Sequence, residues 1–387
     1  MTQLPDVPEV TPLELVRAIE TGSPLQIVDV RATTRVQSGH IDLVPASRFH
    51  NIVGSELRAR TDLAGTGIDP AQRTVVVCGK GNDSRLGAAH LISLGADAVS
   101  LKGGMAAYMD LLVERRFEPP HELDHLLQFD RIGKGSLAYL LVSDGEALVV
   151  DPPRDTVGIE AAARAVGARI VGVADTHVHA DYISGAPALS AALGVPYFLH
   201  PADHVYPYDG TPGKLAITPL KDGMRLHVGR ATFTVLHTPG HTLGQCSFLL
   251  DDVLVLSGDF VLVDSLGRPD LAGHAGEWAE LLWTSLEHAR HDWPKELLVL
   301  PAHYSNAKER RADHSVAGLF GDLLKANQAL ALSDRTAFMA WATAKASVPE
   351  NYKLIKAVNA GLKTVTPAEA TELEVGRNEC ALVTTAH

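Results

Sequence analysis

The sequence predicts an α/β protein built from two domains. Its 387 residues exceed the usual size of a single domain, so two folding units are the natural expectation. As far as Gly104, short apolar strands alternate with helical segments, which is the pattern of a parallel sheet. From Phe129 onward the strands come in pairs, and several of them end in histidine or aspartate. The change of pattern marks a second domain.

Composition excludes several classes of protein. Apolar residues make up 46% of the chain and charged residues 21%, which is ordinary for a globular protein with a core. The net charge of −12 argues against a nucleic-acid-binding surface, which would carry a basic face. We therefore expect no nucleic-acid partner, although a local pocket can still accept an anionic substrate.

Redox and targeting features indicate the cytoplasm. The three cysteines, Cys78, Cys246 and Cys380, form a sparse, odd set that fits a reducing compartment. Residues 1–10 lack the basic and apolar regions of a signal peptide. No run reaches the ~20 apolar residues of a membrane span. We expect a cytoplasmic protein without a membrane partner.

The first domain is expected over residues 9–115. Thr11 to Glu20 predicts a helix, because Thr11 can cap it and Pro12 suits its first turn. Strands and helices then alternate, with strands at 25–31, 74–77 and 98–101 and helices at 51–60, 86–94 and after 104.

A reactive cysteine is expected where the strand at 74–77 ends. The loop Cys78 to Arg85 contains glycines and precedes a helix, so it can turn backbone N–H groups inward beside the positive end of that helix. Such a loop stabilises a thiolate and accepts a sulfur anion. A buried, inert cysteine is the alternative.

This first domain resembles a single rhodanese domain. The motifs that carry the resemblance are Val28-Asp29-Val30-Arg31, Gly39-His40-Ile41, the loop from Cys78, and Leu101-Lys102-Gly103-Gly104. The resemblance implies a persulfide on Cys78 that is formed and discharged in sulfur transfer. Such loops commonly carry an arginine five residues after the cysteine, where this chain has Asp83. Lys80 and Arg85 are expected to supply the positive charge instead, and thiosulfate is expected to be a poor donor.

A linker is predicted at residues 116–124, because Pro119-Pro120 and the surrounding charges break both periodicities. The second domain is expected over residues 125–387, and within it the segment 316–361 predicts two or three amphipathic helices.

In the second domain, four apolar strands are each followed by a residue that can bind a metal. The strands at 169–174, 232–236, 253–256 and 297–300 precede His177, His241, Asp259 and His303. Functional residues collect at strand ends, where a rigid sheet positions them. One such residue would be weak support for a site, but four within one domain predict one.

The segment Thr176 to Tyr182 concentrates this chemistry. Alternation along an extended chain directs His177, His179 and Asp181 to one side. Neutral nitrogen donors with a charged oxygen are what a divalent metal needs. A polar loop in a chain with 18 histidines is the alternative.

The order of these motifs resembles the metallo-β-lactamase superfamily over about residues 125–340, and within it the glyoxalase II-like branch with its persulfide dioxygenases. The motifs are Ala180-Asp181, Thr238-Pro239-Gly240-His241-Thr242, Gly267-Arg268-Pro269-Asp270 and Pro301-Ala302-His303. The resemblance implies an αβ/βα sandwich with the metal site at one edge of its two sheets. It also implies C-terminal helices that cover the substrate mouth or form a homodimer contact, and fused rhodanese domains are known in this branch.

The number of metals depends on Tyr182. Dinuclear hydrolases of the superfamily carry a histidine at this position, and a neutral phenol is a poor ligand. We therefore expect a damaged second metal position, which leaves His177, His241 and Asp259. Two imidazoles and one carboxylate are the ligand set of non-haem Fe(II) and O₂ chemistry. The resemblance makes these three residues the ligands of one Fe(II) per C-terminal domain, with zinc as the alternative.

The remaining polar residues receive supporting roles. His179 and Asp181 are expected to orient ligands or bound water, and His303 to act beside the metal as a base or contact. Tyr182 is expected to donate a hydrogen bond to bound oxygen or a sulfur oxyanion, with simple packing as the alternative.

Arg268 resembles the arginine near the thiol-substrate site of the family, and it could bind a carboxylate through two parallel hydrogen bonds. A structural ion pair with Asp270 is the alternative.

The function expected from these observations is that of a persulfide dioxygenase. It would oxidise the persulfide of glutathione or an analogue with O₂, giving sulfite and the free thiol, while Cys78 supplies persulfide or joins sulfite to sulfur as thiosulfate. The alternatives are a zinc-dependent glyoxalase II-like thioester hydrolase, which Tyr182 disfavours, and a non-catalytic sulfur carrier or sensor, which the intact ligands disfavour.

Overall fold

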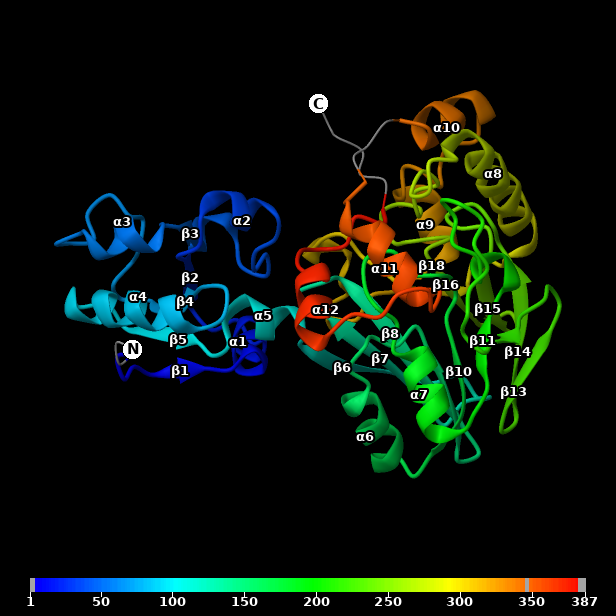
Figure 1. Cartoon of the computed structure of the whole chain (residues 1–387), viewed down its shortest axis with the longest axis horizontal. Coiled ribbons are helices and arrows are strands. Elements are labelled where there is room, and N and C mark those ends of the chain that lie inside the picture. Colours follow the sequence, from blue (N-terminus) through cyan, green and yellow to red (C-terminus); the bar gives the residue numbers. More distant parts are fainter. Residues whose placement is uncertain (1–3, 345–347, 382–387) are drawn as a thin grey trace. The chain divides into compact units, whose positions relative to one another are not determined.

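The computed structural model describes residues 4–344 and 348–381, and Figure 1 shows the whole chain. Its described part forms two compact units. Within the described residues, the first comprises residues 4–113, 131–134 and 375–377, and the second comprises residues 114–130, 135–344, 348–374 and 378–381. The predictions that concern residues 1–3, 345–347 and 382–387 lie outside the described residues.

The first unit is a five-stranded sheet in which every pairing is parallel, as predicted. The strands, in sheet order, are β1 (Glu9–Val10), β5 (Ala98–Leu101), β4 (Arg73–Val77), β2 (Leu25–Asp29) and β3 (Phe49–Asn51). The helices are α1 (Pro12–Glu20), α2 (Thr33–Gln37), α3 (Gly54–Arg58), α4 (Asn82–Ser93) and α5 (Gly104–Met109). Apolar residues of α1 and α5 cover one face of the sheet, and those of α3 and α4 cover the other.

One helix prediction in this unit is partly wrong. The segment 51–60 begins with the last residue of β3, and the helix starts only at Gly54. The Asn51 side chain donates hydrogen bonds to the backbone oxygens of Asp29 and Arg31, at 2.9 and 3.0 Å. These bonds hold Asn51 beside β2 in an extended conformation. The local helical pattern does not reveal such bonds, because their acceptors lie far away in the sequence.

The second unit contains two sheets that pack face to face. The seven-stranded sheet has the order β12 (Thr218–Pro219), β11 (Tyr197–Leu199), β10 (Arg169–Ala174), β9 (Glu146–Val150), β8 (Ser136–Ser143), β7 (His125–Arg131) and β6 (Leu112–Phe117). The six-stranded sheet has the order β13 (Arg225–Val228), β14 (Ala231–His237), β15 (Cys246–Leu250), β16 (Leu254–Gly258), β17 (Leu298–Pro301) and β18 (Gly318–Leu319). Tyr139 and Leu148 of the first sheet share a core with Phe233 and Phe248 of the second.

Helices cover the outer face of each sheet, so the unit has the predicted four-layered αβ/βα arrangement (Figure 1). The helices α6 (Val157–Ala165) and α7 (Ala186–Leu193) pack against β10. The long helix α8 (Ala275–Asp292) packs Leu282 and Leu286 against Val255 and Val299 of the other sheet. The tail adds α9 (Phe320–Ala326), α10 (Arg335–Ala342), α11 (Asn351–Asn359) and α12 (Pro367–Leu373).

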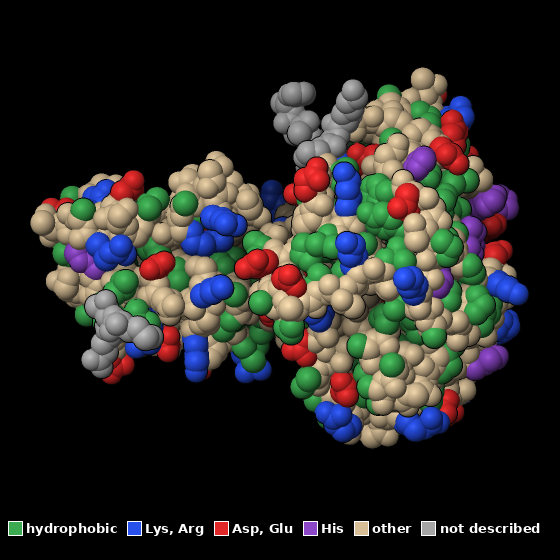
Figure 2. Space-filling view, viewed as in Figure 1, with side chains coloured by type: hydrophobic (Ala, Val, Ile, Leu, Met, Phe, Trp, Pro, Cys, Tyr) green, Lys and Arg blue, Asp and Glu red, His purple; other side chains and the backbone are tan. Residues whose placement is uncertain are grey.

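The predicted linker at 116–124 overlaps the end of β6. Buried Val113 is followed by exposed and half-buried charged residues, and this alternation suits a strand at the edge of a sheet. Pro119-Pro120 then follow the strand. In Figure 2, acidic and basic side chains are interspersed over the visible face of the larger unit. Within the described residues, no helix has both the length and the apolar character needed to cross a membrane.

Candidate metal centre

The four residues predicted from strand ends come together in the second unit. His177 follows β10, His241 follows β14, Asp259 follows β16 and His303 follows β17, and all four side chains are fully buried. Gly258 makes the turn that delivers Asp259: its φ is +56°, and a Cβ there would lie 2.4 Å from the Gln245 amide nitrogen. A residue with a side chain would therefore clash at this position.

Three of these residues direct ligand atoms at one point. Asp259 Oδ2 lies 3.7 Å from His177 Nε2 and 3.4 Å from His241 Nε2. Among the described residues, none of these three buried atoms has a hydrogen-bond partner. Buried polar atoms without partners are costly, and a divalent cation between them would satisfy all three. The donor set therefore fits a metal ion.

The other nitrogen of each imidazole is held by the protein. His241 Nδ1 donates to the backbone oxygen of Arg268 at 2.9 Å. His177 Nδ1 lies 3.0 Å from the hydroxyl of Thr176, which itself donates to the Asp151 carboxylate. These bonds leave the Nε2 lone pairs facing the metal position. Burial lowers the pKa of His177 well below its ordinary value and also lowers the pKa of His241, so both rings are neutral ligands.

His303 lies between two carboxylates. Its Nδ1 is 2.7 Å from Asp259 Oδ1, and its Nε2 is 3.3 Å from Asp181 Oδ2. Burial alone would lower the pKa of His303, but Asp259 and Asp181 raise it to about 10. Burial would also raise the pKa of Asp259, and the His303 ring reverses this, leaving that pKa lowered. His303 is therefore a charged ring that orients Asp259, and its predicted role as a base or contact beside the metal stays a prediction.

His179 belongs to a second group of donors. Ligand atoms of His179, Asp181 and His303 lie within 4.8 Å of one another. The Nε2 of His179 is 3.1 Å from Asp151 Oδ1, whereas its Nδ1 has no hydrogen-bond partner among the described residues. Burial would lower the pKa of His179, but Asp151 raises it above the ordinary value.

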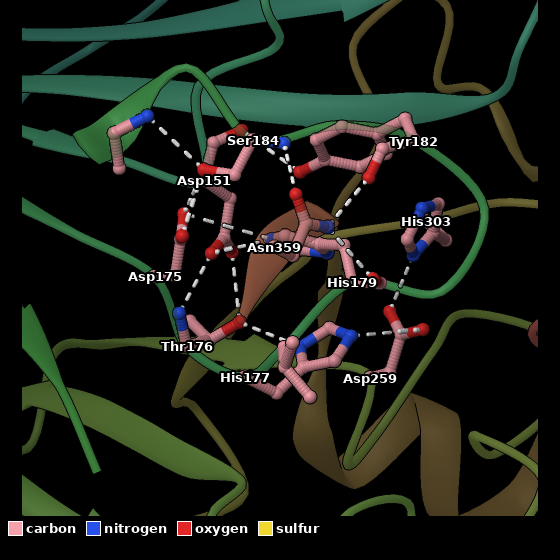
Figure 3. A network of polar contacts seen from close by, with 12 residues as sticks. Asp151, Asp175, Thr176, His177, His179, Tyr182, Ser184, Asp259, His303 and Asn359 are labelled. Atoms are coloured by element: carbon pink, nitrogen blue, oxygen red, sulfur yellow. Dashed lines mark hydrogen bonds and ion pairs between the residues drawn. The ribbon is translucent and has the colours of Figure 1, made fainter. Parts of the chain in front are cut away.

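Tyr182 is held in the interior. Its ring stacks on His179 with centroids 4.3 Å apart, and its hydroxyl donates to the backbone oxygen of Asp151 at 3.1 Å (Figure 3). Burial raises the pKa of Tyr182 well above its ordinary value, so the phenol keeps its proton. This geometry agrees with the alternative that Tyr182 only packs in the interior. A hydrogen bond from its hydroxyl to a bound oxygen or sulfur oxyanion stays a prediction.

Asp151, at the end of β9, organises this network and was missed in the sequence. Its carboxylate accepts hydrogen bonds from the Thr176 amide at 2.7 Å and from the Thr176 hydroxyl at 2.9 Å, and it pairs with His179 (Figure 3). The same signal that identified the ligands, a polar residue directly after an apolar strand, applies to Asp151 as well.

Asp203 and Asn359 also position the loops, and no sequence signal identifies them. The Asp203 carboxylate accepts from the Val178 amide, the Thr242 hydroxyl and the Gly244 amide at 2.7–2.8 Å. It thereby joins the loop of His177 to the loop of His241. The Asn359 amide of α11 donates to the backbone oxygens of His179 and Tyr182, both at 2.9 Å.

Arg268 forms a structural ion pair with Asp270, which was the alternative to a contact with the substrate. The buried guanidinium donates to both carboxylate oxygens of Asp270, at 2.6 and 2.7 Å. Asp270 raises the pKa of Arg268 against the effect of burial. A substrate contact through Arg268 stays a prediction.

In the first unit, Cys78 sits in the expected loop. The Gly81 amide donates to Cys78 Sγ at 3.1 Å, and the thiol lies 3.3 Å from the Ser84 hydroxyl. The backbone of Gly104 closes over the loop, because a Cβ there would lie 2.4 Å from the Cys78 oxygen. Lys80 is exposed, whereas the guanidinium of Arg85 donates to the Pro5 oxygen at 2.8 and 3.1 Å.

Comparisons with known proteins match both units. A model of the rhodanese-like domain covers residues 11–111, and a model of the metallo-β-lactamase superfamily covers residues 131–303. An uncharacterized protein of Aquifex aeolicus is 31% identical over 188 residues, which are 45% of this chain and 87% of that protein. The mitochondrial persulfide dioxygenase ETHE1 of Homo sapiens is 27% identical over 208 residues, covering 53% of this chain and 72% of that protein.

Among solved structures, a metallo-β-lactamase from Staphylococcus aureus has a TM-score of 0.52 at 24% identity, covering 66% of this chain and 74% of that chain. This likeness supports the fold alone.

Proposed function

Because the chain belongs to the metallo-β-lactamase superfamily and carries an N-terminal rhodanese-like domain, both as its sequence predicts, we propose that it is a persulfide dioxygenase coupled to sulfur transfer. The reaction would convert a thiol persulfide, O₂ and water into the free thiol and sulfite. The observation that carries the proposal is the donor set of two neutral imidazoles and one carboxylate, each with an atom that lacks a partner.

His177, His241 and Asp259 would hold one Fe(II). The bound iron would supply oxygen activation beside the substrate sulfur. The chain's own groups fix the ligands: Thr176 and the Arg268 oxygen orient the two rings, and His303 orients the carboxylate. The protonated His303 would lie beside the reacting atoms and could give its proton to the departing thiolate.

The Cys78 loop would handle sulfane sulfur. A persulfide on Cys78 would receive the hydrogen bond that the Gly81 amide now gives to the thiol sulfur. Attack of sulfite on the outer sulfur would release thiosulfate and restore the Cys78 thiolate. Asp83 stands in the first turn of α4, so a singly charged persulfide suits this loop better than doubly charged thiosulfate.

A second candidate is a zinc-dependent thioester hydrolase of the glyoxalase II type. The cluster of His179, Asp181 and His303, and the unpartnered Nδ1 of His179, favour it because they could hold a second metal. Against it, the His303 ring already lies between two carboxylates, those of Asp259 and Asp181. The Tyr182 hydroxyl also donates its hydrogen bond to the backbone oxygen of Asp151.

The two candidates separate in one experiment. The full chain is purified under anaerobic conditions, its iron and zinc are measured per chain, and O₂ uptake is followed with glutathione persulfide. We expect close to one iron per chain and substrate-dependent O₂ uptake with sulfite as product. Two zinc ions per chain with cleavage of a glutathione thioester, and no O₂ uptake, would replace the proposal with the hydrolase.

A further inference from the structure

A cavity that takes no part in the metal centre lies where the six-stranded sheet meets α8 (Figure 1). Its volume is about 410 Å³. Leu236 of β14 and Leu249 of β15 line it from the sheet, and Ser285 and Ala289 line it from the helix. None of its lining residues belongs to the two groups of donors around the metal position, so the cavity needs an explanation of its own.

One part of the lining, which we call the apolar wall, is a carbon surface. It consists of Leu236, Leu249, Ala289, Trp293 and Pro294. The Trp293 ring is held from behind, because it packs edge-on against Phe260 and Phe320 with centroids 5.6 and 5.2 Å away. A hydrocarbon chain bound on this wall would leave water without having to order the indole first.

Three aspartates line the same cavity: Asp222, Asp252 and Asp292. One oxygen of Asp222 accepts a hydrogen bond from the His237 amide at 2.8 Å, and Asp292 lies 2.6 Å from the exposed His291 ring. Among the described residues, none of the three carboxylates forms an ion pair with a lysine or an arginine. Carboxylates gathered around one cavity make its potential negative, which favours a cationic ligand.

No basic side chain of the described residues offsets these charges inside the cavity. Arg290 follows the lining residue Ala289, but its guanidinium binds Glu287 and two backbone oxygens, each at 2.7 Å. Lys221 and Lys295 adjoin lining residues in the chain and do not line the cavity themselves.

Two imidazoles do line the cavity, those of His237 and His288. The Nε2 of His237 lies 2.8 Å from the backbone oxygen of Leu243, so this ring is already engaged. Three carboxylates face two imidazoles, and the lining therefore stays negative even when both rings are protonated.

A single metal ion does not suit this arrangement. Metal ions in proteins are held by several donor atoms that converge on one point. Among the described residues, the groups of three or more such atoms within 4.8 Å of one another include none of the aspartates or histidines of this cavity. Negative charges that are spread around an apolar wall call for a ligand whose positive charges are separated by hydrocarbon.

We propose that this cavity binds a linear aliphatic polyamine. Its ammonium groups would pair with Asp222, Asp252 and Asp292, and its methylene chain would lie on the apolar wall. Ion pairs at exposed carboxylates are individually weak, so the site depends on several of them acting together with burial of the chain. The inference is independent of the proposed function, because no residue of the metal centre takes part in it.

Calorimetry with matched ligands tests the charges. The full chain is titrated at low ionic strength with 1,5-diaminopentane, pentylamine and 1,5-pentanediol, which share one carbon chain and carry two, one and no positive charges. We expect one site per chain for the diamine, about 3- to 5-fold weaker binding of pentylamine, and no measurable binding of the diol. Equal binding of the diamine and the monoamine would contradict a site with several carboxylates.

Bis(2-aminoethyl) ether tests the apolar wall. It matches 1,5-diaminopentane in length and charge but has an oxygen in place of the central methylene. Burial of that methylene predicts that the ether binds about 3-fold more weakly. Equal affinities would mean that the ligand touches only the carboxylates, and the cavity would then not be its site.

Asp252→Asn and Asp251→Asn form a matched pair of variants. Both residues are exposed in the turn between β15 and β16, and each change removes one negative charge, but only Asp252 lines the cavity. Asp251 has a φ of +42°, which asparagine also adopts. We expect Asp252→Asn to weaken binding of the diamine about 3- to 5-fold, and Asp251→Asn to leave it within about 1.5-fold of the wild type.

The double variant with Asp222→Asn and Asp252→Asn should weaken binding by about 10-fold or more. Asparagine at position 222 keeps an oxygen that can accept the His237 amide, so the fold should be retained. Equal weakening by Asp251→Asn and Asp252→Asn, or several weak sites per chain, would overturn the inference. Either result would show only the general attraction of polyamines to a chain with a net charge of −12.

Discussion

Two of the four described groups of side chains that could hold a metal ion differ in the protonation of their rings. Around His177, His241 and Asp259, three ligand atoms face one another without hydrogen-bond partners among the described residues. In the group of His179, Asp181 and His303, the His303 ring is paired with carboxylates on both sides. His179 Nδ1 and His303 Nε2 of the second group also lack hydrogen-bond partners among the described residues. The groups differ instead in protonation: the lowered pKa values of His177 and His241 keep both rings neutral, whereas His303 carries a proton between Asp259 and Asp181.

The largest effect should come from removing the one carboxylate of the first group. Asp259→Ala leaves two imidazoles, which we expect to retain less than about a tenth of the wild-type metal, since even indirect contacts change metal affinity 10- to 100-fold. O₂ uptake should be lost with the metal. Metal per chain is measured after anaerobic purification. Asp181→Ala is the matched control and should keep the metal, whereas equal metal loss in both variants would show that the second group also binds a metal ion.

The next effect concerns the protonated ring in the second group. His303→Gln removes the charge between Asp259 and Asp181, and leaving buried carboxylates without it should lower the free energy of unfolding of the metal-free protein by about 3–5 kcal/mol. Urea unfolding measures this difference.

The same ring predicts a pH dependence. The pKa of His303 is raised to about 10 in the folded protein, from an ordinary value of 6.5. The stabilisation is therefore complete below about pH 6.5 and is lost as the pH rises towards 10. Metal-free wild type should lose stability over this interval, and His303→Gln should lose less. Parallel curves for the two proteins would contradict the assignment of the proton to His303.

The sequence predicts the site well where the side chain follows a strand. Asp259 and Asp151 come directly after an apolar strand, and His177, His241 and His303 follow within the loop after theirs. Asp203 and Asn359 could not be predicted, because their roles depend on loops that lie 25 to 180 residues away in the chain. The burial of Lys356 was not predicted either, because a lysine in an amphipathic helix is expected on the solvent-exposed face.

The fold also shows this difference between features that depend on local sequence and features that depend on distant partners. Alternation of strands and helices predicts the parallel sheet of the first unit, because each element is specified by its own residues. The extended conformation of Asn51 depends instead on hydrogen bonds to Asp29, at the end of the neighbouring strand β2, and to Arg31, two residues beyond it. A local sequence pattern does not identify hydrogen-bond partners 20 or more residues away. The predicted helix therefore begins too early.

A smaller effect is expected from the relay behind His177. The Thr176 hydroxyl joins the Asp151 carboxylate to the His177 ring. Thr176→Val keeps the shape of the side chain but removes this link, and we expect metal affinity to fall about 10-fold. Competition with a chelator measures the affinity, and Thr176→Ser, which keeps the hydroxyl, should stay near the wild type. Equal affinities for all three proteins would mean that the relay does not orient the ring.

Tyr182 should give the smallest effect, and it distinguishes packing from chemistry. Its hydroxyl donates to the Asp151 backbone oxygen, and the ring stacks on His179. Tyr182→Phe keeps the stacking and removes one buried hydrogen bond, so the free energy of unfolding should fall by about 1 kcal/mol. If the hydroxyl serves only the interior, O₂ uptake should stay within about threefold of the wild type. A loss of about 100-fold in kcat with unchanged metal content would instead place the phenol proton on the oxygen or sulfur of the reacting substrate. Tyr182 would then have to rotate away from Asp151 during turnover.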